Sequence, residues 1–180
     1  MALKSTVYRV ELNVADVDRH YYADHTLTIA RHPSETDERM MVRLLVFALY
    51  ADPALVFGKG LSDADDADLW QRDLTGAIER WIEVGQPDER RIAKACGRAG
   101  EVVVCAYGPT ARTWWQQNAA KLARFANLRV LALAPEASRA LAGFARRTMH
   151  VQATITDGEV LVSSVDGSLG VGPETLQAPR

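Results

Sequence analysis

The chain has 180 residues, of which 48% are hydrophobic and 24% charged, and its net charge is −2. This length and composition are typical of one globular domain, residues 1–180, with a sizeable core, and they exclude a disordered or fibrous chain. The small negative charge excludes a global positive field that would draw the whole molecule onto nucleic acid or an anionic membrane. Polyanion binding would therefore need a local patch.

The amino-terminal residues MALKSTVYRVELNV lack the apolar run of a secretion signal. No segment approaches the roughly 18 consecutive apolar residues that a membrane span needs. Cys96 and Cys105 have apolar neighbours, which indicates core thiols in a reducing compartment and not a disulfide framework. We therefore expect a cytoplasmic, monomeric protein with no membrane partner.

Two alternating segments open the chain and predict a long β-hairpin over residues 1–31. After Pro33, Ser34 and Asp37 fit the capping pattern of a hydroxyl followed three residues later by an acid. Apolar residues then recur at helical spacing from Met40 to Ala51, which predicts a deeply buried helix that ends before Pro53.

Three short strands are predicted next, at residues 55–57, 67–71 and 80–85. Gln86-Pro87-Asp88-Glu89 then begins a helix that Gly100 stops, and EVVVCAY (101–107) is typical of a strand buried on both faces.

The remainder of the chain alternates in the same manner, with Asp157-Gly158 as a strong turn signal between two final strands. The predicted elements are a helix at 109–125, a strand at 128–133, a helix at 135–146, strands at 149–155 and 160–163, and a loosely ordered, flexible tail at 167–180.

Two acids occupy the second and third of the short strands. Glu83 lies in Trp-Ile-Glu-Val-Gly, where a carboxylate is costly to bury unless a positive group meets it. Asp68 follows an acidic loop, and 14 residues lie between it and Glu83. That separation allows neighbouring strands to bring the two carboxylates together. Mg²⁺ takes such hard oxygen ligands, shares its shell with a phosphate, and activates an attacking water.

The order of elements and these acid positions resemble the PD-(D/E)XK, or restriction-endonuclease-like, core. The resemblance implies an α/β (α+β) fold with a mixed central β-sheet flanked by helices. The αβββαβ core would span residues 34–107, with an added amino-terminal hairpin, extra elements over 109–165 and a carboxyl-terminal hairpin. It also implies that Asp68 and Glu83 hold Mg²⁺, for which Mn²⁺ can substitute, and that a lysine two residues after the glutamate assists the nucleophile.

HPSETDERMM, WIEVGQPDERRIAKAC, WWQQN and FANL resemble signature stretches of the YaeQ family of bacterial proteins. The longest of these stretches has 16 residues, and the resemblance extends from MALKSTVYR to the final hairpin. It implies a fold similar to the PD-(D/E)XK core and leaves the activity open.

One departure concerns the basic residue, because Gly85 stands where the nuclease pattern has lysine. In some superfamily members this residue has moved to the following helix, where Lys94 and Arg91 are available. Arg91, Lys94 and Arg98 share one stripe of that helix, roughly opposite its apolar face. The stripe is interpreted either as a solvated surface or as a phosphate-binding surface.

Alternatives stay open for each candidate. Glu83 would equally suit a structural ion pair with an arginine. If Asp68 belongs to the solvated loop, Asp66 or Asp73 would take its place as the partner of Glu83. Glu38, on the long helix, either reaches the site or faces elsewhere.

Two functions follow as expectations: a divergent Mg²⁺-dependent nuclease acting on DNA or RNA, or a degenerate nuclease-fold protein that binds nucleic acid or a protein partner. Trp114 and Trp115 are interpreted as core and edge residues in preference to base-stacking platforms.

Overall fold

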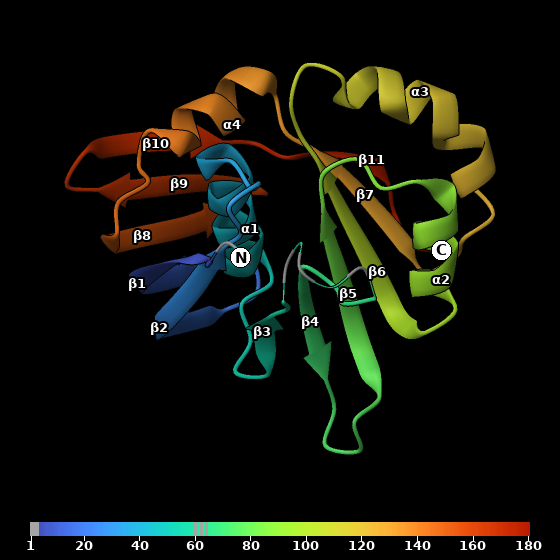
Figure 1. Cartoon of the computed structure of the whole chain (residues 1–180), viewed down its shortest axis with the longest axis horizontal. Coiled ribbons are helices and arrows are strands. Elements are labelled where there is room, and N and C mark those ends of the chain that lie inside the picture. The colour runs from blue at the N-terminus through green and yellow to red at the C-terminus, as the bar shows by residue number, and fades with distance from the viewer. Residues whose placement is uncertain (1–3, 60, 62, 64) are drawn as a thin grey trace.

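The structure is a computed structural model that describes residues 4–59, 61, 63 and 65–180. In this part of the chain the strands form two sheets (Figure 1). Sheet A has the strand order β10 (Gly167–Val171), β9 (Glu159–Ser164), β8 (Thr148–Thr156), β1 (Thr6–Asp16) and β2 (Tyr21–Arg31). Sheet B has the order β11 (Glu174–Gln177), β7 (Leu128–Ala132), β6 (Ala99–Ala106), β5 (Ile78–Val84), β4 (Leu69–Arg72) and β3 (Leu55–Phe57).

The helices pack between and beside these sheets. They are α1 (Asp37–Leu49), α2 (Glu89–Cys96), α3 (Ala111–Leu122) and α4 (Pro135–Ala142). In Figure 1, α1 lies between the two sheets, α4 packs beside it over sheet A, and α2 and α3 cover the far side of sheet B. None of the helices in the described part of the chain has both the length and the apolar character needed to cross a membrane.

The main hydrophobic core surrounds α1. Met40 and Phe47 of this helix belong to the same buried cluster as Leu12 of sheet A and Val103 of sheet B. A second core on the far face of sheet B includes Trp114 of α3. The nearly all-apolar composition of the second half of α1 is explained by this position, because the helix meets a sheet on two sides.

The sheets differ from the single central sheet that was predicted. The amino-terminal hairpin β1–β2 forms as expected, and so does the β8–β9 hairpin around Asp157-Gly158. The two hairpins, however, join each other through parallel pairing of β1 with β8, with Val10 opposite Met149. Alternation in a sequence indicates which face of a strand is buried but not which strand lies beside it, so this second sheet could not be predicted.

Boundaries of all four helices also differ from the predictions. The cap of α1 is Thr36 and not Ser34, since the Thr36 hydroxyl accepts a hydrogen bond from the Arg39 amide at 3.1 Å. Helix α2 ends at Cys96 and is capped by Gly97, so Gly100 is not the residue that stops it. Gly100 instead lies in β6, where a Cβ atom would stand only 3.1 Å from the Glu79 carbonyl oxygen. Helices α3 and α4 are shorter than the predicted spans 109–125 and 135–146.

The segment 167–180, predicted as a loosely ordered, flexible tail, contributes one strand to each sheet. Strand β10 pairs with β9, and β11 pairs antiparallel with β7. Gln177 donates hydrogen bonds to the carbonyls of Leu122 and Phe125 at 3.2 and 3.3 Å. The prediction was wrong because glycine and proline were taken as signs of disorder, whereas Gly167 and Gly170 lie within β10 and Gly172 and Pro173 separate β10 from β11.

Within sheet B, β3, β4 and β5 are antiparallel neighbours, and β6 and β7 run parallel to β5. The chain therefore passes through α1, three antiparallel strands, α2 and a parallel strand. The start of β4 and the end of β5 lie side by side because Leu69 pairs with Ile82. This edge of the sheet carries the candidate site.

Candidate functional site

Asp68 and Glu83 line the same pocket. Asp68 was predicted to lie within a strand, but β4 begins one residue later, at Leu69. Glu83 is the penultimate residue of β5. Both residues are only 3% exposed. The pocket has a volume of about 410 Å³, and Gly85, Gln86 and Pro87 also line it. The fold thus brings together the two acids that the sequence singled out.

Asp68 is held by two donors. Its Oδ1 atom accepts from Arg39 Nη2 at 2.6 Å, and its Oδ2 atom accepts from the Val84 amide at 2.7 Å. Arg39 lies on α1, so the helix between the sheets supplies the counter-charge. Both oxygens of this buried carboxylate already have a protein partner.

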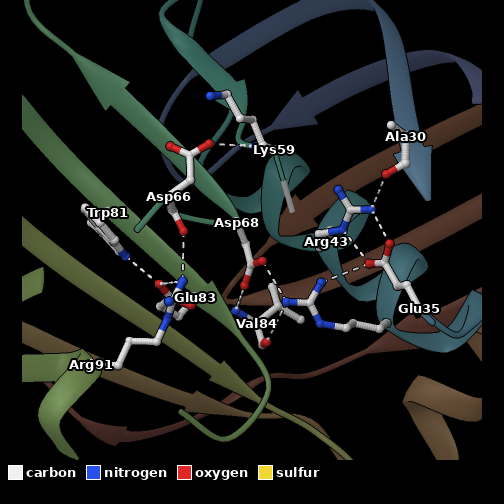
Figure 2. Close-up of polar contacts among 11 residues, drawn as sticks. Ala30, Glu35, Arg43, Lys59, Asp66, Asp68, Trp81, Glu83, Val84 and Arg91 are labelled. Atoms are coloured by element: carbon white, nitrogen blue, oxygen red, sulfur yellow. Dashed lines mark hydrogen bonds and ion pairs between the residues drawn. The ribbon is translucent and has the colours of Figure 1, made fainter. Parts of the chain in front are cut away.

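Glu83 is held differently, as Figure 2 shows. Its Oε1 atom accepts from Trp81 Nε1 at 2.6 Å and lies 2.9 Å from Arg91 Nη2. Among the described residues none donates to its Oε2 atom. Burial raises the pKa of Glu83 above its ordinary value, and the nearby charge of Asp68 raises it further. Glu83 is therefore the less completely compensated of the two acids.

A further layer of buried charge lies behind Asp68. Arg39 Nη1 donates to Glu35 Oε1 at 2.9 Å, and Arg43 donates to both Glu35 oxygens at 2.8 and 2.7 Å. Arg43 also donates to the Ala30 carbonyl at 3.1 Å, which ties the network to sheet A (Figure 2). The chain of contacts runs from β2 through α1 to the edge of sheet B.

These side chains balance one another in charge. The carboxylates of Glu35, Asp68 and Glu83 face the guanidinium groups of Arg39, Arg43 and Arg91. Burying a charge is costly unless an opposite charge accompanies it, and here each carboxylate has at least one guanidinium partner. The sequence predicted Arg91 but not the other two arginines. The spacing of four residues was the available signal, since Arg39 and Arg43 share one face of α1 and Glu35 lies just before its Thr36 cap.

Of the three basic candidates, Arg91 lines the pocket, and Lys94 and Arg98 do not. Arg91 reaches Glu83 and donates to the Asp66 carbonyl at 2.8 Å, although its stripe was expected to point away from the packed face. Lys94 instead bonds the Asp65 carboxylate, and the Arg98 guanidinium lies over the Trp81 ring at 5.3 Å from its centre.

Three other acids are engaged elsewhere. Glu38 accepts from the Ser138 hydroxyl at 2.6 Å and so faces α4. The Asp66 carboxylate accepts from the Lys59 amide at 2.7 Å (Figure 2), and the Asp73 carboxylate caps the β4–β5 turn at Thr75. Of the acids weighed from the sequence, Asp68 and Glu83 are therefore the pair that the pocket contains.

The tryptophans match the interpretation as core and edge residues. Trp114 is 9% exposed and donates to the Pro87 carbonyl at 3.0 Å, whereas Trp115 is half-buried at the margin of the same core. Within the described residues, no group of three or more histidine, cysteine, aspartate or glutamate side chains is placed to hold one metal ion.

Comparisons with known proteins agree with one another. The family profile described as YaeQ protein matches residues 1–173. The chain is 48% identical over 180 residues to the uncharacterised YaeQ protein of Escherichia coli (strain K12), covering 99% of both sequences. It is similar to the crystal structure of the YaeQ protein from Xanthomonas axonopodis pv. citri, with a TM-score of 0.95, 51% identity, and coverage of 97% of this chain and 99% of that one. The crystal structure of YaeQ protein from Pseudomonas syringae gives a TM-score of 0.93, 37% identity and 97% coverage of both chains.

Proposed function

This chain belongs to the YaeQ family, and on that premise we propose that it is a binding protein on a restriction-endonuclease-like core that does not hydrolyse phosphodiesters. The observation that carries the proposal is the pairing of both pocket carboxylates with guanidinium groups, Asp68 with Arg39 at 2.6 Å and Glu83 with Arg91 at 2.9 Å. Gly85 in place of the expected lysine supports the same conclusion.

The restriction-endonuclease-like core is supported by topology. The helix α1, three antiparallel strands, α2 and a parallel strand follow one another in the order that the resemblance implies. Asp68 and Glu83 stand at neighbouring ends of the second and third of these strands. The proposal is that this scaffold kept its acids and replaced the cation with arginines.

The energetic argument concerns Arg39. A Mg²⁺ ion shared by Asp68 and Glu83 would displace Arg39 from Asp68, although its side chain is only 13% exposed. Breaking a buried ion pair costs about 3–5 kcal/mol, because it leaves one charge uncompensated. A guanidinium also stays protonated at all ordinary pH values, so neither arginine is suited to activate water as a base.

The expected ligand is a cationic or hydrogen-bond-donating group of a protein partner. Glu83 Oε2 is the carboxylate oxygen in the pocket that can accept a hydrogen bond from this ligand. Asp63 also lines the pocket and adds negative charge. Such a pocket repels a phosphate backbone and favours a lysine or arginine side chain.

Calorimetry and cleavage assays together test this function. The wild-type chain is titrated with Mg²⁺ and Mn²⁺ and incubated with single- and double-stranded DNA and RNA, beside the Asp68→Asn variant. We expect no heat of metal binding and no cleavage above the level of Asp68→Asn. Metal-dependent cleavage that Asp68→Asn abolishes would overturn the proposal.

One observation favours the nuclease as a second candidate. Asp68 and Glu83 share a solvent-connected pocket, and Arg91 comes from the helix where a migrated basic residue is found in the superfamily. In this alternative, Asp68 and Glu83 would hold Mg²⁺, which would activate the attacking water, and Arg39 and Arg91 would be free to contact the scissile phosphate. Arg91→Met would then tighten Mg²⁺ binding and weaken cleavage, whereas the binding function predicts no metal affinity in either protein.

A further inference from the structure

Two arginines meet at one end of sheet A, far along the sequence from each other. Arg9 of β1 and Arg147, just before β8, line a hollow of about 320 Å³ together with Val7 and Thr148. The parallel pairing of β1 with β8 places Arg9 opposite Thr148. The Arg9 amide donates to the Arg147 carbonyl at 2.9 Å, which fixes the two backbones.

These arginines differ from most others in the chain. In the described residues, neither Arg9 nor Arg147 forms an ion pair, and no carboxylate lines the hollow. The Arg147 side chain donates to the Val7 carbonyl at 3.1 Å. The adjacent Arg146, by contrast, is paired with Asp166 at 3.1 Å. The hollow therefore holds two positive charges without a local counter-charge.

A third arginine, Arg31, lies near Tyr8 but already has a counter-charge in Asp37. The guanidinium carbons of Arg31 and Arg147 lie 5.5 and 5.7 Å from the centre of the Tyr8 ring. Arg31 pairs with Asp37 through Nη1 at 2.5 Å, but its buried Nε atom has no acceptor in the described part of the chain. Arg31 does not line the hollow, so the positive charge there is that of Arg9 and Arg147.

We propose that Arg9 and Arg147 form a binding site for a phosphate group. Guanidinium groups recognise phosphate through paired hydrogen bonds in a fixed planar geometry. The net charge of −2 gives the molecule no general attraction for polyanions, so binding here would be local. This site is separate from the carboxylate pocket and does not depend on the function proposed for it.

The phosphate could belong to a small molecule or to a nucleic-acid backbone, and two probes distinguish these sources. The full chain is titrated by calorimetry at low ionic strength with inorganic pyrophosphate and, separately, with a short single-stranded DNA. Binding of pyrophosphate alone assigns the site to a small phosphate compound. Binding of the DNA, with affinity that falls as salt rises, assigns it to a nucleic-acid backbone. Binding of neither overturns the proposal.

Matched variants locate the binding. We expect Arg9→Gln with Arg147→Gln to weaken binding at least about tenfold and to reduce the salt slope for DNA by about two, one for each lost phosphate contact. Arg90→Gln is the control, because Arg90 is an exposed arginine of α2 away from the hollow. Equal weakening by the control would overturn the assignment. If circular dichroism shows that the double variant is misfolded, Arg9→Gln alone, which removes no hydrogen bond seen here, gives the same test.

Discussion

Glu35 is the acid on which the buried charges of α1 depend. It accepts from Arg43 through both oxygens and from Arg39 through one, and it is 5% exposed. Glu35→Gln keeps the shape but removes the negative charge, so the Arg43 guanidinium, 1% exposed, is left without compensation. We expect the free energy of unfolding to fall by about 3–5 kcal/mol in urea titrations.

The control for this experiment is Glu136→Gln, on the same kind of pair at the surface. The Glu136 side chain is 79% exposed and lies 3.7 Å from Arg139. Its loss should change the free energy of unfolding by about 0.5 kcal/mol or less. Equal effects of the two substitutions would mean that burial does not strengthen the Glu35 contacts.

Glu83 should make stability depend on pH in an unusual direction. Burial, and then the charge of Asp68, raise its pKa in the folded protein. Between the unfolded value, about 4.3, and this raised value, the folded protein binds more protons than the unfolded chain. The contribution of Glu83 to the free energy of unfolding is therefore largest below that window and is lost as pH rises through the folded pKa.

The variant Glu83→Gln isolates this contribution, because glutamine does not titrate. The free energy of unfolding of both proteins is measured by urea titration at a series of acidic pH values. The wild-type value minus the variant value should decrease as pH rises. A difference that stays constant or increases with pH would contradict a raised pKa at Glu83.

At the scale of the elements, local patterns carried most of the prediction. The alternation through Val10 and Leu12, the apolar run of α1 and the turn at Asp157-Gly158 specify hairpins and a buried helix, because each signal lies within a few residues. Asp68 and Glu83 were identified for a related reason, since an acid in an apolar strand is conspicuous by itself.

The partners of those elements could not be predicted from local patterns. Arg39 lies 29 residues before Asp68, and the contact exists only because α1 crosses the edge of sheet B. Tertiary packing therefore decides whether a buried carboxylate binds a metal cation or pairs with an arginine. The same limit explains why β1 was not expected beside β8.

The final strand offers a test of the element that was misjudged. Removing residues 174–180 deletes β11, uncovers the edge of β7 and removes Leu176 from its packing against the outer core. We expect the free energy of unfolding to fall by about 2–4 kcal/mol, from lost hydrogen bonds of about 1 kcal/mol each and lost apolar burial. Thermal or urea unfolding measures this change.

A shorter truncation serves as the control. Removing only residues 178–180 deletes the bond from the Arg180 amide to the Ala126 carbonyl but leaves β11 paired. The free energy of unfolding should fall clearly less than it does on removal of residues 174–180. If both truncations leave stability unchanged, β11 contributes nothing to the fold.

At the scale of the whole molecule, both sheets depend on the same helix. Side chains of α1 such as Met41 and Leu44 belong to a core that contains residues of sheets A and B together. A chain that begins at residue 32 would lack β1 and β2 and would expose that core. We expect it to lose its near-ultraviolet circular dichroism and to bind a dye for exposed apolar surface.

A matched deletion of residues 1–5, which ends before β1, should keep both the native spectrum and a cooperative unfolding transition. A cooperative transition in the longer deletion would show instead that sheet B and α1 form an independent folding unit.

The parallel pairing of β1 with β8 has a consequence for biosynthesis. At about 5–20 residues per second, a ribosome delivers β8 on the order of ten seconds after β1. Throughout that interval the nascent hairpin presents an unpaired strand edge and an uncovered apolar face, the features that favour wrong association. Newly made chains of this protein should therefore depend on chaperones for longer than chains whose paired strands follow one another in the sequence.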